Sequence, residues 1–447
     1  MDEKLAILGG KKTIDKENED LFKWPIITKE HEEAVLQVIR EENMSGLNIT
    51  KQFEEQYAAN LGRRYGLASP NGTASIEEAM FALGVGAGDE VIAPSITYWA
   101  SVLQAYNLGA TPVFAEIDPN TLCIDPNDIE HRITSRTKLI VVIHLGAMPA
   151  DMDAILTLAA KHNIKVLEDC SHAHGALYKG KEVGTFGDAS VFSLMSVKSF
   201  AIGEGGILVT DDRSVYDRAV LFGHYIRHAE IKSENLRKYA GLPCGAHKNR
   251  LTQMNAALGL VQLKKYPNQM KEIDKAMNYF CDYLEDTPGL KPIRPEKKSG
   301  TTKGGWYYPL FKYHPDELGG LSLTRFCKAI NAEGSFCSPG VIAPMHLHPI
   351  LTEMDIYGHG KPTRIANYKG SNPEELLHQS LPVSESINKF AFEVPWFKHF
   401  WKEEIDKHVK AYQKVVANYR DLLPDDDKKQ DEYIGAYSSA FGSMDKY

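Results

Sequence analysis

From about residue 66, short hydrophobic segments alternate with longer segments in which apolar residues recur at helical spacing. This alternation predicts parallel strands linked by crossover helices, an α/β fold. Helical spacing is found in SVLQAYNLG (101–109) and in ADMDAILTLAAKHN (150–163), which has Asp151 in its first turn and Asn163 at its end. The expected strands are EVIAPS, TPVFAEI, KLIVVIHL, IKVLEDC, ASVFSL and GGILVT, all between residues 90 and 210.

The pattern changes at residues 251–285, where a long helical stretch with charges on one side predicts a helix that joins two domains. Strand-like WYYPLFKY and helix-like LTRFCKAINAEG and KEEIDKHVKAYQKVVANYRDLL follow, as in a smaller α+β domain. The polar end of the chain is low in aliphatic residues. We therefore expect four parts: an N-terminal arm (1–20), a large domain (21–265), a small C-terminal domain (266–423) and a polar tail (424–447).

Composition narrows the function classes. The chain has 447 residues, of which 43% are hydrophobic and 25% charged, with a net charge of −8 and no long basic run. A protein that binds nucleic acid or an anionic membrane usually carries a basic surface, so both functions are disfavoured. Chemistry on a small molecule is the better expectation for a chain long enough to bury a large core.

The six cysteines are scattered without CxxC pairs, which predicts reduced thiols rather than disulfides. The N-terminus has no apolar stretch of the kind found in signal peptides, and LIVVI (139–143) is far too short to span a bilayer. We therefore expect a cytoplasmic protein.

Residues 68–80, ASPNGTASIEEAM, place Asn71, Gly72, Thr73 and Ser75 between a short strand and a helix. Free N–H groups at a helix start attract an anion such as phosphate. A plain helix cap made by Asn71 or Thr73 is the structural alternative. The glycines of LGVGAGDEV (83–91) follow a helix and precede a strand, which is the reverse of a dinucleotide site and predicts a simple turn.

In IKVLEDCSHAHGA (164–176) a buried strand ends in an acid, Asp169, followed by His172 and His174. Open α/β sheets bind ligands at the carboxyl ends of their strands. A metal site made of these three residues would match H-x-H, a weak signal without a further ligand, and a strand-end acid with surface histidines is the structural alternative. We expect no metal.

Lys198 lies among apolar and small residues in FSLMSVKSFAIGEGG (192–206), shortly after Ser193. A lysine withdrawn from water has a lowered pKa and can act as a neutral nucleophile toward a carbonyl, whereas a surface lysine or an ion-pair partner is the alternative. A phosphate cradle, a strand-end acid and a lysine beside a serine are together the parts needed to hold pyridoxal 5'-phosphate.

The motifs that contain these residues belong to a resemblance that covers most of the chain. The chain is similar to the DegT/DnrJ/EryC1/StrS family of sugar and cyclitol aminotransferases, from LAILGG near the N-terminus to the final helix. The resemblance rests on GDEVIAPSITY, LGATPVFAEIDPNT, PADMDAI, LEDCSHAHGA, FSLMSVKSFAIGEGG and KNRLTQMNAALG, in that order. It implies fold type I of the pyridoxal phosphate enzymes: a large domain with a mostly parallel mixed sheet flanked by helices, and a smaller α+β C-terminal domain.

The resemblance also implies roles for individual residues. Lys198 matches the Schiff-base lysine, and Asp169 matches the acid that pairs with the pyridine nitrogen. Gly72, Thr73 and Ser193 match the phosphate cradle. Tyr98 matches the aromatic residue that stacks on the cofactor ring, with Trp99 as the alternative, and His172 stands where relatives often have a glutamine near the ring hydroxyl.

Two further positions concern partners and substrates. Lys248 matches a residue that reaches the phosphate from the neighbouring subunit, which implies a homodimer with shared active sites. HLGAMP (144–149) lacks the tyrosine of the family's H-L-Y-G-x-P pattern, which affects substrate contacts more than cofactor binding. PMHLHP (344–349) is similar to a segment of the branch that includes cyclitol and aminohydroxybenzoate enzymes, and it makes His346 a candidate substrate contact.

The resemblance therefore implies a pyridoxal phosphate-dependent aminotransferase that moves an amino group from glutamate or glutamine to a keto sugar or keto-cyclitol by a ping-pong mechanism. One alternative is a catalytically silent protein of the same fold with a binding or regulatory role. Another is a different activity on sugars such as dehydration, although the related dehydratases have histidine in place of Lys198. A nicotinamide oxidoreductase is disfavoured by the misplaced glycines.

Overall fold

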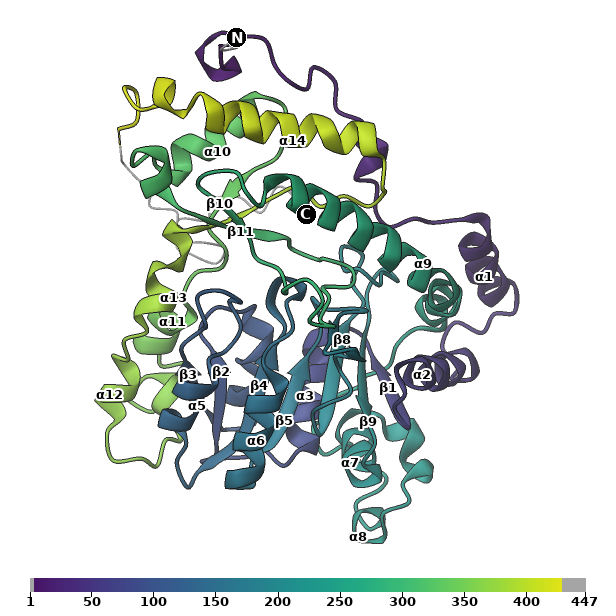
Figure 1. Cartoon of the computed structure of the whole chain (residues 1–447). Coiled ribbons are helices and arrows are strands. Elements are labelled where there is room, and N and C mark those ends of the chain that lie inside the picture. Colours follow the sequence, from purple (N-terminus) through teal and green to yellow (C-terminus); the bar gives the residue numbers. More distant parts are fainter. Residues whose placement is uncertain (1–3, 428–447) are drawn as a thin grey trace.

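The computed structural model describes residues 4–427. Its large domain is built on a seven-stranded sheet with helices on both faces (Figure 1). The strand order is β1-β9-β8-β5-β4-β2-β3, with parallel pairing from β8 to β3 and antiparallel pairing of β9 with β1 and β8. The strands are β1 (Tyr65–Ser69), β2 (Glu90–Pro94), β3 (Thr111–Ala115), β4 (Thr137–Ile143), β5 (Lys165–Asp169), β8 (Ala189–Ser193) and β9 (Gly206–Thr210).

All six expected strands are confirmed, and the sheet is the mostly parallel mixed sheet that the resemblance implied. Neighbouring residues of each strand enter separate cores on opposite faces. Leu139 and Val141 of β4 belong to one core, and Ile140 and Val142 belong to the other. Strands covered on both faces need continuous apolar runs, and this explains why these segments were recognisable in the sequence.

Helices begin and end at the predicted residues where the capping group is a neighbour in the sequence. In α6 the Asp151 side chain accepts a hydrogen bond from Ala154 N, and Asn163 ends the helix with a left-handed φ of 54°. The helices around the large sheet are α1 (Lys29–Arg40), α2 (Asn48–Leu61), α3 (Gly72–Ala82), α4 (Gln104–Asn107), α5 (Pro126–Arg132), α6 (Met152–His162), α7 (Arg213–Gly223) and α8 (Glu234–Arg237).

The helix expected over residues 101–109 is wrong in extent. Residues Trp99–Ser101 form a 3₁₀ turn, and α4 covers only four residues. The two are separated by Val102, whose φ of −128° and ψ of −44° are not helical. The turn directs the Ser101 hydroxyl to Asp169 at the end of β5. This contact outside the segment explains why the helical pattern does not produce one continuous helix.

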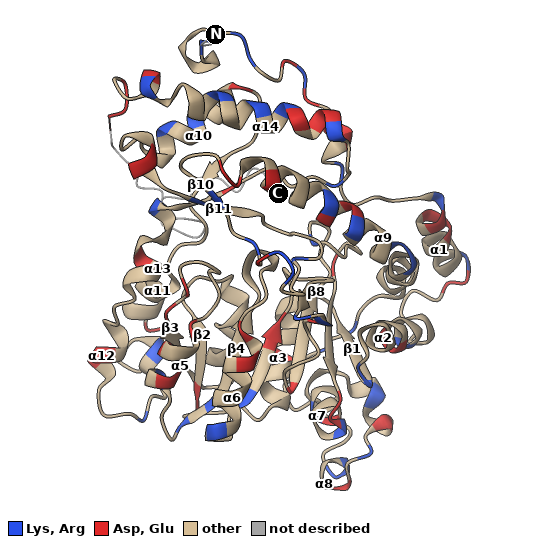
Figure 2. Ribbon diagram, viewed as in Figure 1, with Lys and Arg blue, Asp and Glu red and all other residues tan. Residues whose placement is uncertain are grey.

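The predicted linking helix is α9 (Gln253–Leu284). Its first half contributes Ala256 and Leu263 to the core of the large domain, and its second half contributes Ile273 and Phe280 to the core of the small one. The expected boundary at residue 265 therefore falls inside this helix. Charges of both signs alternate along α9 and α14 (Lys402–Ala417) (Figure 2).

The small domain contains a four-stranded antiparallel sheet in the order β10-β11-β13-β12. Leu5 and Leu21 pack into its core, so the N-terminal arm lies against this domain. The remaining elements are β10 (Leu290–Pro292), β11 (Leu310–Tyr313), β12 (Ser338–Pro339), β13 (Ala391–Glu393), α10 (Leu323–Ala332), α11 (Pro349–Thr352), α12 (Pro373–Leu377) and α13 (Pro382–Ser386), together with the hairpin strands β6 (Leu177–Tyr178) and β7 (Lys181–Glu182).

The segment that carries α11, α12 and α13 leaves the small domain and packs beside β3 (Figure 1). Arg364 Nε donates to the Pro112 carbonyl across 3.2 Å, and Gln379 Nε2 donates to the Phe114 carbonyl. These side chains cover the outer edge of β3. The sequence pattern did not predict this segment.

All six cysteines are free thiols, as expected. Among residues 4–427, every helix is too short or too polar to cross a membrane. Most of the predicted polar tail, from residue 428 onward, lies outside the described residues.

Candidate active site

Three of the expected site segments meet at one edge of the large sheet. Asp169 is the last residue of β5 and Ser193 the last residue of β8. Gly72 begins α3 directly after β1, which runs parallel to β8 because both are antiparallel to β9. The carboxyl ends of parallel strands form a ligand-binding edge in open α/β sheets, and the fold therefore brings these residues together.

Lys198 lies in the turn after β8 and is only 8% exposed. Its backbone is fixed by two hydrogen bonds: its N–H donates to Met195 O across 2.9 Å, and its carbonyl accepts from Trp24 Nε1 across 2.8 Å. Its Nζ lies 4.0 Å from the ring centroid of Tyr307. In the described part of the chain, no atom accepts a hydrogen bond from Nζ and no carboxylate pairs with it.

The electrostatics of Lys198 follow from this position. Burial lowers its pKa to about 7, although the negative charge of Asp169 acts in the opposite direction. The amine is therefore neutral in a substantial fraction of the molecules at physiological pH. An amine without its proton is a nucleophile and a base. The surface-lysine alternative is excluded by the burial.

Asp169 is 4% exposed and accepts two hydrogen bonds. Ser101 Oγ donates to Oδ2 across 2.6 Å, and the Ser171 N–H donates to Oδ1 across 3.0 Å. Thr97 Oγ1 in turn donates to Ser101 Oγ across 3.2 Å. Donors to both oxygens hold the carboxylate in one orientation.

The start of α3 approaches Ser193 closely. A Cβ added to Gly72 would lie 2.9 Å from Ser193 Cβ, so residue 72 has no room for a side chain. Asn71 caps the helix by accepting from Ala74 N. The N–H groups of Gly72 and Thr73 have no carbonyl partner inside the helix, as at every helix start. Asn71 therefore caps the helix, and the N–H groups of Gly72 and Thr73 are left available for an anion.

His172 is half-buried, His174 is buried, and both are neutral. Burial, then the positive charge of Lys198, lower the pKa of His172 well below its usual range. The Gly146 N–H, from the HLGAMP segment, donates to His172 Nδ1 across 3.4 Å, and the ring lies 4.6 Å from that of Tyr307. Burial lowers the pKa of His174 to about 3, and its ring stacks on Phe200.

One group of potential metal ligands occurs in residues 4–427, and it consists of His144, Glu168 and Cys170. The Glu168 carboxylate is already saturated: it accepts from the backbone N–H groups of Gly184, Phe186 and Gly187 and pairs with His144 Nε2 across 3.2 Å. These bonds outweigh its burial and lower its pKa to about 2. The group is therefore explained as a structural network behind the site.

The other predicted residues lie in different settings. Tyr98 is 39% exposed and its ring lies 5.0 Å from that of Trp99, so both aromatic candidates are available to a ligand. Lys248 is exposed, in the segment before α9. His346 is buried, with Nδ1 2.7 Å from Ser95 Oγ and Nε2 3.2 Å from Glu385 Oε1. A substrate contact by His346 would require one of these two bonds to be exchanged.

Sequence reasoning missed three residues of the site: Trp24, Ser101 and Tyr307. Trp24 lies before α1, Ser101 lies in the turn before α4, and Tyr307 lies just before β11. Ser101 follows Tyr98 in the motif GDEVIAPSITY and its continuation WAS, so its closeness to that motif was a usable signal. Nothing local marks Trp24 or Tyr307, because their roles depend on contacts across the fold.

The site fits pyridoxal 5'-phosphate on observations of this chain alone. A buried amine without a hydrogen-bond partner faces an aromatic ring. A fixed carboxylate ends the neighbouring strand. A helix start whose first residue cannot carry a side chain supplies free N–H groups for a phosphate.

Comparison with known proteins identifies the family and the fold. A profile of the DegT/DnrJ/EryC1/StrS aminotransferase family matches residues 25–413. An L-glutamine:scyllo-inosose aminotransferase of Streptomyces griseus is 30% identical over 438 residues, which cover 94% of this chain and 100% of that protein. A GDP-perosamine synthase of Escherichia coli O157:H7 is 39% identical over 351 residues, covering 77% and 90%.

Among solved structures, an aminotransferase from Psychrobacter cryohalolentis superimposes with a TM-score of 0.77 at 29% identity. The match covers 89% of this chain and 99% of that one. The fold is therefore shared over nearly its whole length.

Proposed function

Because the chain belongs to the DegT/DnrJ/EryC1/StrS aminotransferase family and is a pyridoxal phosphate-dependent aminotransferase, we propose that it transfers an amino group from glutamine or glutamate to a keto-cyclitol or keto sugar. The observation that carries the catalytic part is Lys198, a buried amine with a pKa of about 7 beside a fixed carboxylate. Such an amine is suited to take and return protons near neutral pH.

The length of the similarity supports a cyclitol as acceptor. The inosose aminotransferase aligns with 94% of this chain, whereas the perosamine synthase aligns with 77%. The perosamine synthase is more similar where it aligns, at 39% identity, and this keeps a nucleotide-linked keto sugar as the second candidate. Glutamine is the donor that the name of the inosose enzyme gives.

We assign the cofactor contacts as follows. Lys198 would form the covalent link, Asp169 would pair with the pyridine nitrogen, and His172 would hydrogen bond to the ring hydroxyl. Tyr98 would stack on the ring, and Lys248 would reach the phosphate from a partner subunit. Gly72, Thr73 and Ser193 would form the cradle that holds the phosphate.

When bound, pyridoxal phosphate supplies an aldehyde that condenses with amines and a protonated ring that withdraws electrons from the reacting carbon. The Asp169 carboxylate would stabilise a proton on the ring nitrogen, because a nearby negative charge favours a cation. Lys198 Nζ would accept the proton from the α-carbon of the amino donor and return it. Neutral His172 is placed to donate or accept a hydrogen bond without adding charge.

A homodimer is supported by the surface around Lys248. The segment before it exposes large apolar side chains: Tyr225, Ile226, Tyr239 and Leu242, the last at 80% exposure. Apolar residues gathered beside a basic residue with no carboxylate partner in the described chain suit a contact with a second copy. Sedimentation velocity is expected to show a dimer, and a monomer at micromolar concentration would contradict this part of the proposal.

The free thiols support a cytoplasmic location.

The function is tested by separating the two half-reactions. The enzyme is loaded with pyridoxal phosphate, and L-glutamine or L-glutamate is added while the visible absorbance is followed. We expect the absorbance to fall, and to return when scyllo-inosose is added after removal of the donor. A return only with a nucleotide-linked keto sugar would make the sugar the acceptor. Loss of response to both donors, with Lys198 intact, would instead support the silent binding protein.

A further inference from the structure

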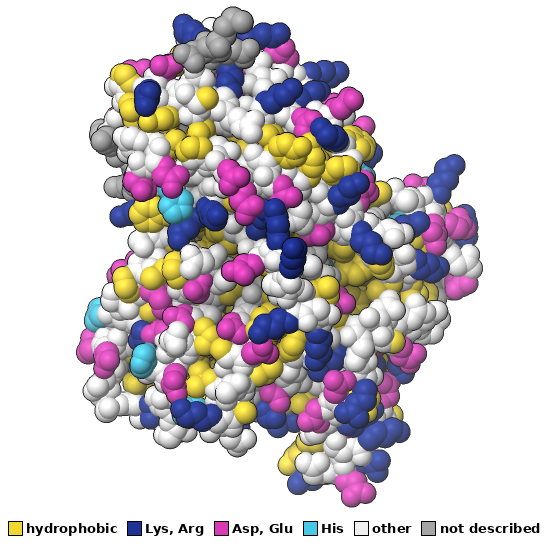
Figure 3. All heavy atoms as spheres, in the orientation of Figure 1, with side chains coloured by type: hydrophobic (Ala, Val, Ile, Leu, Met, Phe, Trp, Pro, Cys, Tyr) yellow, Lys and Arg dark blue, Asp and Glu magenta, His cyan; other side chains and the backbone are white. Residues whose placement is uncertain are grey.

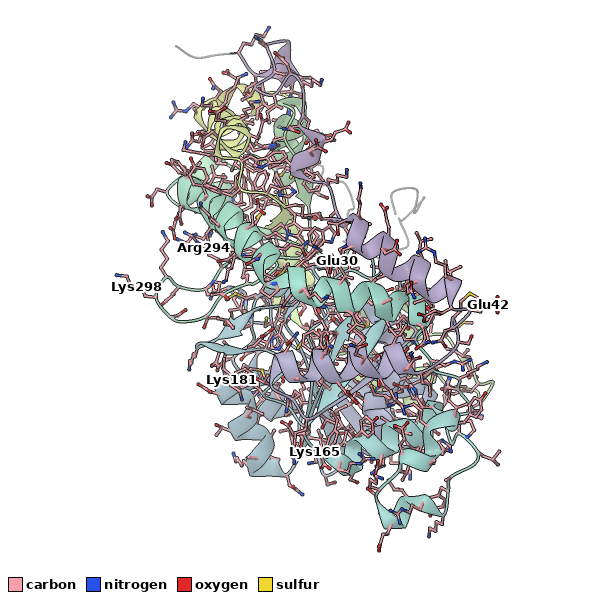
Figure 4. All side chains as sticks on the ribbon, turned by 90° about the vertical axis from the view of Figure 1, so that its right-hand side faces the viewer. Glu30, Glu42, Lys165, Lys181, Arg294 and Lys298 are labelled. Carbon is pink, nitrogen blue, oxygen red and sulfur yellow. The ribbon has the colours of Figure 1, made fainter. Side chains whose placement is uncertain are left out.

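A pocket of about 500 Å³ is lined by none of the residues assigned to the cofactor. Its walls are the end of α2, the β6–β7 hairpin, the middle of α9 and residues 302–304. Hydrophobic side chains gather below α9 on the right of the face shown in Figure 3. In Figure 4, Lys181, the neighbour of Glu182 in the hairpin, lies beside the end of α2 and below α9.

Three aromatic rings line this pocket: Tyr57, Phe200 and Tyr266. Phe200 meets Tyr57 at 5.5 Å with rings 79° apart and Tyr266 at 5.4 Å with rings 60° apart. Tyr57 is only 6% exposed, and its hydroxyl has no hydrogen-bond partner among the described residues. Phe200 is fully buried behind the two tyrosines, so Tyr57 and Tyr266 are the rings that face the pocket. Aromatic rings attract an organic cation.

Two carboxylates complete the lining, Glu182 and Asp274. Neither forms an ion pair in the described chain. Glu182 accepts from Tyr266 Oη at 3.4 Å, and Asp274 accepts from Trp306 Nε1 at 2.6 Å. Burial raises the pKa of both groups. A cation in the pocket would offset the cost of burying these two negative charges.

The helix that roofs the pocket adds one more acceptor. Pro267 lies inside α9 and has no N–H, so the carbonyl of Leu263, four residues earlier, lacks its helical donor. Both residues line the pocket. Lys271 is the only basic residue among the described residues that line the pocket.

We propose that this pocket is a second binding site, separate from the cofactor, for a small organic cation: an ammonium group on a compact apolar or hydroxylated body. The rings of Tyr57 and Tyr266 contact the body of the cation, and the carboxylates of Glu182 and Asp274 pair with its charge. The volume falls within the range of sites for small organic molecules.

The test is calorimetric titration of the pyridoxal phosphate-loaded enzyme with benzyltrimethylammonium. A quaternary ammonium ion cannot condense with the cofactor aldehyde, so binding at Lys198 is avoided. Benzyl alcohol is the neutral comparison. We expect saturable binding of the cation and roughly fivefold or more weaker binding of benzyl alcohol, because the alcohol lacks the charge.

Variants locate the binding. Glu182→Gln and Asp274→Asn remove charge with little change of shape, and each is expected to weaken cation binding by roughly fivefold. Glu130→Gln removes an equal charge on the surface, where Glu130 pairs with Lys161, and is expected to leave binding within about twofold. Melting temperatures show whether each variant is folded.

Three results would overturn the proposal: no saturable binding of the cation, equal binding of benzyl alcohol, or undiminished cation binding in both pocket variants. If one variant does not fold, the proposal is still tested by the other variant and by the comparison of the two probes on the unmodified enzyme.

Discussion

The Nζ atom of Lys198 lies 4.0 Å from the centre of the Tyr307 ring. The two residues belong to different parts of the chain, one in the turn after β8 and the other just before β11. The ring covers the amine on one side and replaces water there. A ring face also attracts the ammonium form, so Tyr307 affects the pKa of Lys198 as well as its exposure.

Replacing the ring is expected to shift the titration of Lys198. A cation–π contact favours the charged amine by about 0.5–2 kcal/mol, so its loss lowers the pKa by up to roughly 1.5 pH units. The rate at which cofactor-free enzyme takes up pyridoxal phosphate should rise through about pH 7 as Lys198 loses its proton. In Tyr307→Leu this rise should occur at lower pH, and in Tyr307→Phe, which keeps the ring face, it should not move. An upward shift in Tyr307→Leu would mean that entry of water outweighs the ring contact.

Removal of the amine is expected to abolish the reaction. Lys198→Ala lacks both the covalent link and the proton-transferring group, and loss of the second alone costs about 10²- to 10⁴-fold in rate. The variant should lose the visible absorbance of bound cofactor and its response to glutamine. Lys179→Ala, in which an exposed lysine paired with Asp153 is removed, should behave as the unmodified enzyme. Normal turnover by Lys198→Ala would refute the assignment.

The cradle at α3 predicts a steric effect. In Gly72→Ala the new Cβ would lie 2.9 Å from Ser193 Cβ, and overpacking of this kind costs about 1–3 kcal/mol. Cofactor affinity, measured by fluorescence titration, should therefore fall by roughly fivefold or more. Gly86→Ala is the control, since the nearest atom to its Cβ would be 3.9 Å away. Unchanged affinity in Gly72→Ala would place the phosphate elsewhere.

Ser101 is expected to act through Asp169. A hydrogen bond to a charged group contributes about 1.5–3 kcal/mol, so Ser101→Ala should reduce kcat by roughly 10- to 100-fold. Asp169 keeps its bond from the Ser171 N–H, and for this reason the loss should be smaller than in Asp169→Asn. The absorbance maximum of the bound cofactor, followed against pH, should change in Ser101→Ala and remain unchanged in Ser196→Ala, which removes an exposed hydroxyl. A change in thermal stability alone would make Ser101 merely structural.

Glu168 predicts a pH dependence of stability. Its pKa is about 2 in the folded protein against an ordinary 4.5, so its contribution is complete above about pH 4.5 and is lost as the pH falls toward 2. Glu168→Gln should lower the free energy of unfolding by roughly 3 kcal/mol at pH 7, and the difference from the unmodified protein should shrink at pH 3. Urea titrations at both pH values measure this. The same comparison with Glu130→Gln should show a difference near zero at pH 7, because that carboxylate is on the surface.

Local chemistry explains which predictions from sequence succeeded. Each of the six strands contains a run of apolar residues because helices cover both faces of the sheet. Asn71, Asp151 and Asn163 cap helices through contacts within four residues. The segment 99–109 deviates because its Ser101 contacts a residue 68 positions away. The helices between β12 and β13 show no strong hydrophobic periodicity. They are attached to β3 by hydrogen bonds from the buried polar side chains of Arg364 and Gln379.

By itself, the sequence determined the alternation of strands and helices, the placement of Asp169 at a strand end and the presence of Lys198 shortly after another strand. It could do so because each of these properties depends on neighbours in the chain. Only the tertiary structure decided that Lys198 is desolvated under Tyr307, that Ser101 orients Asp169, and that aromatic and acidic residues from α2, β7 and α9 line one pocket. Those properties depend on contacts between residues that are far apart in the sequence. Such contacts decide which groups are shielded from water, and no local sequence pattern reveals them.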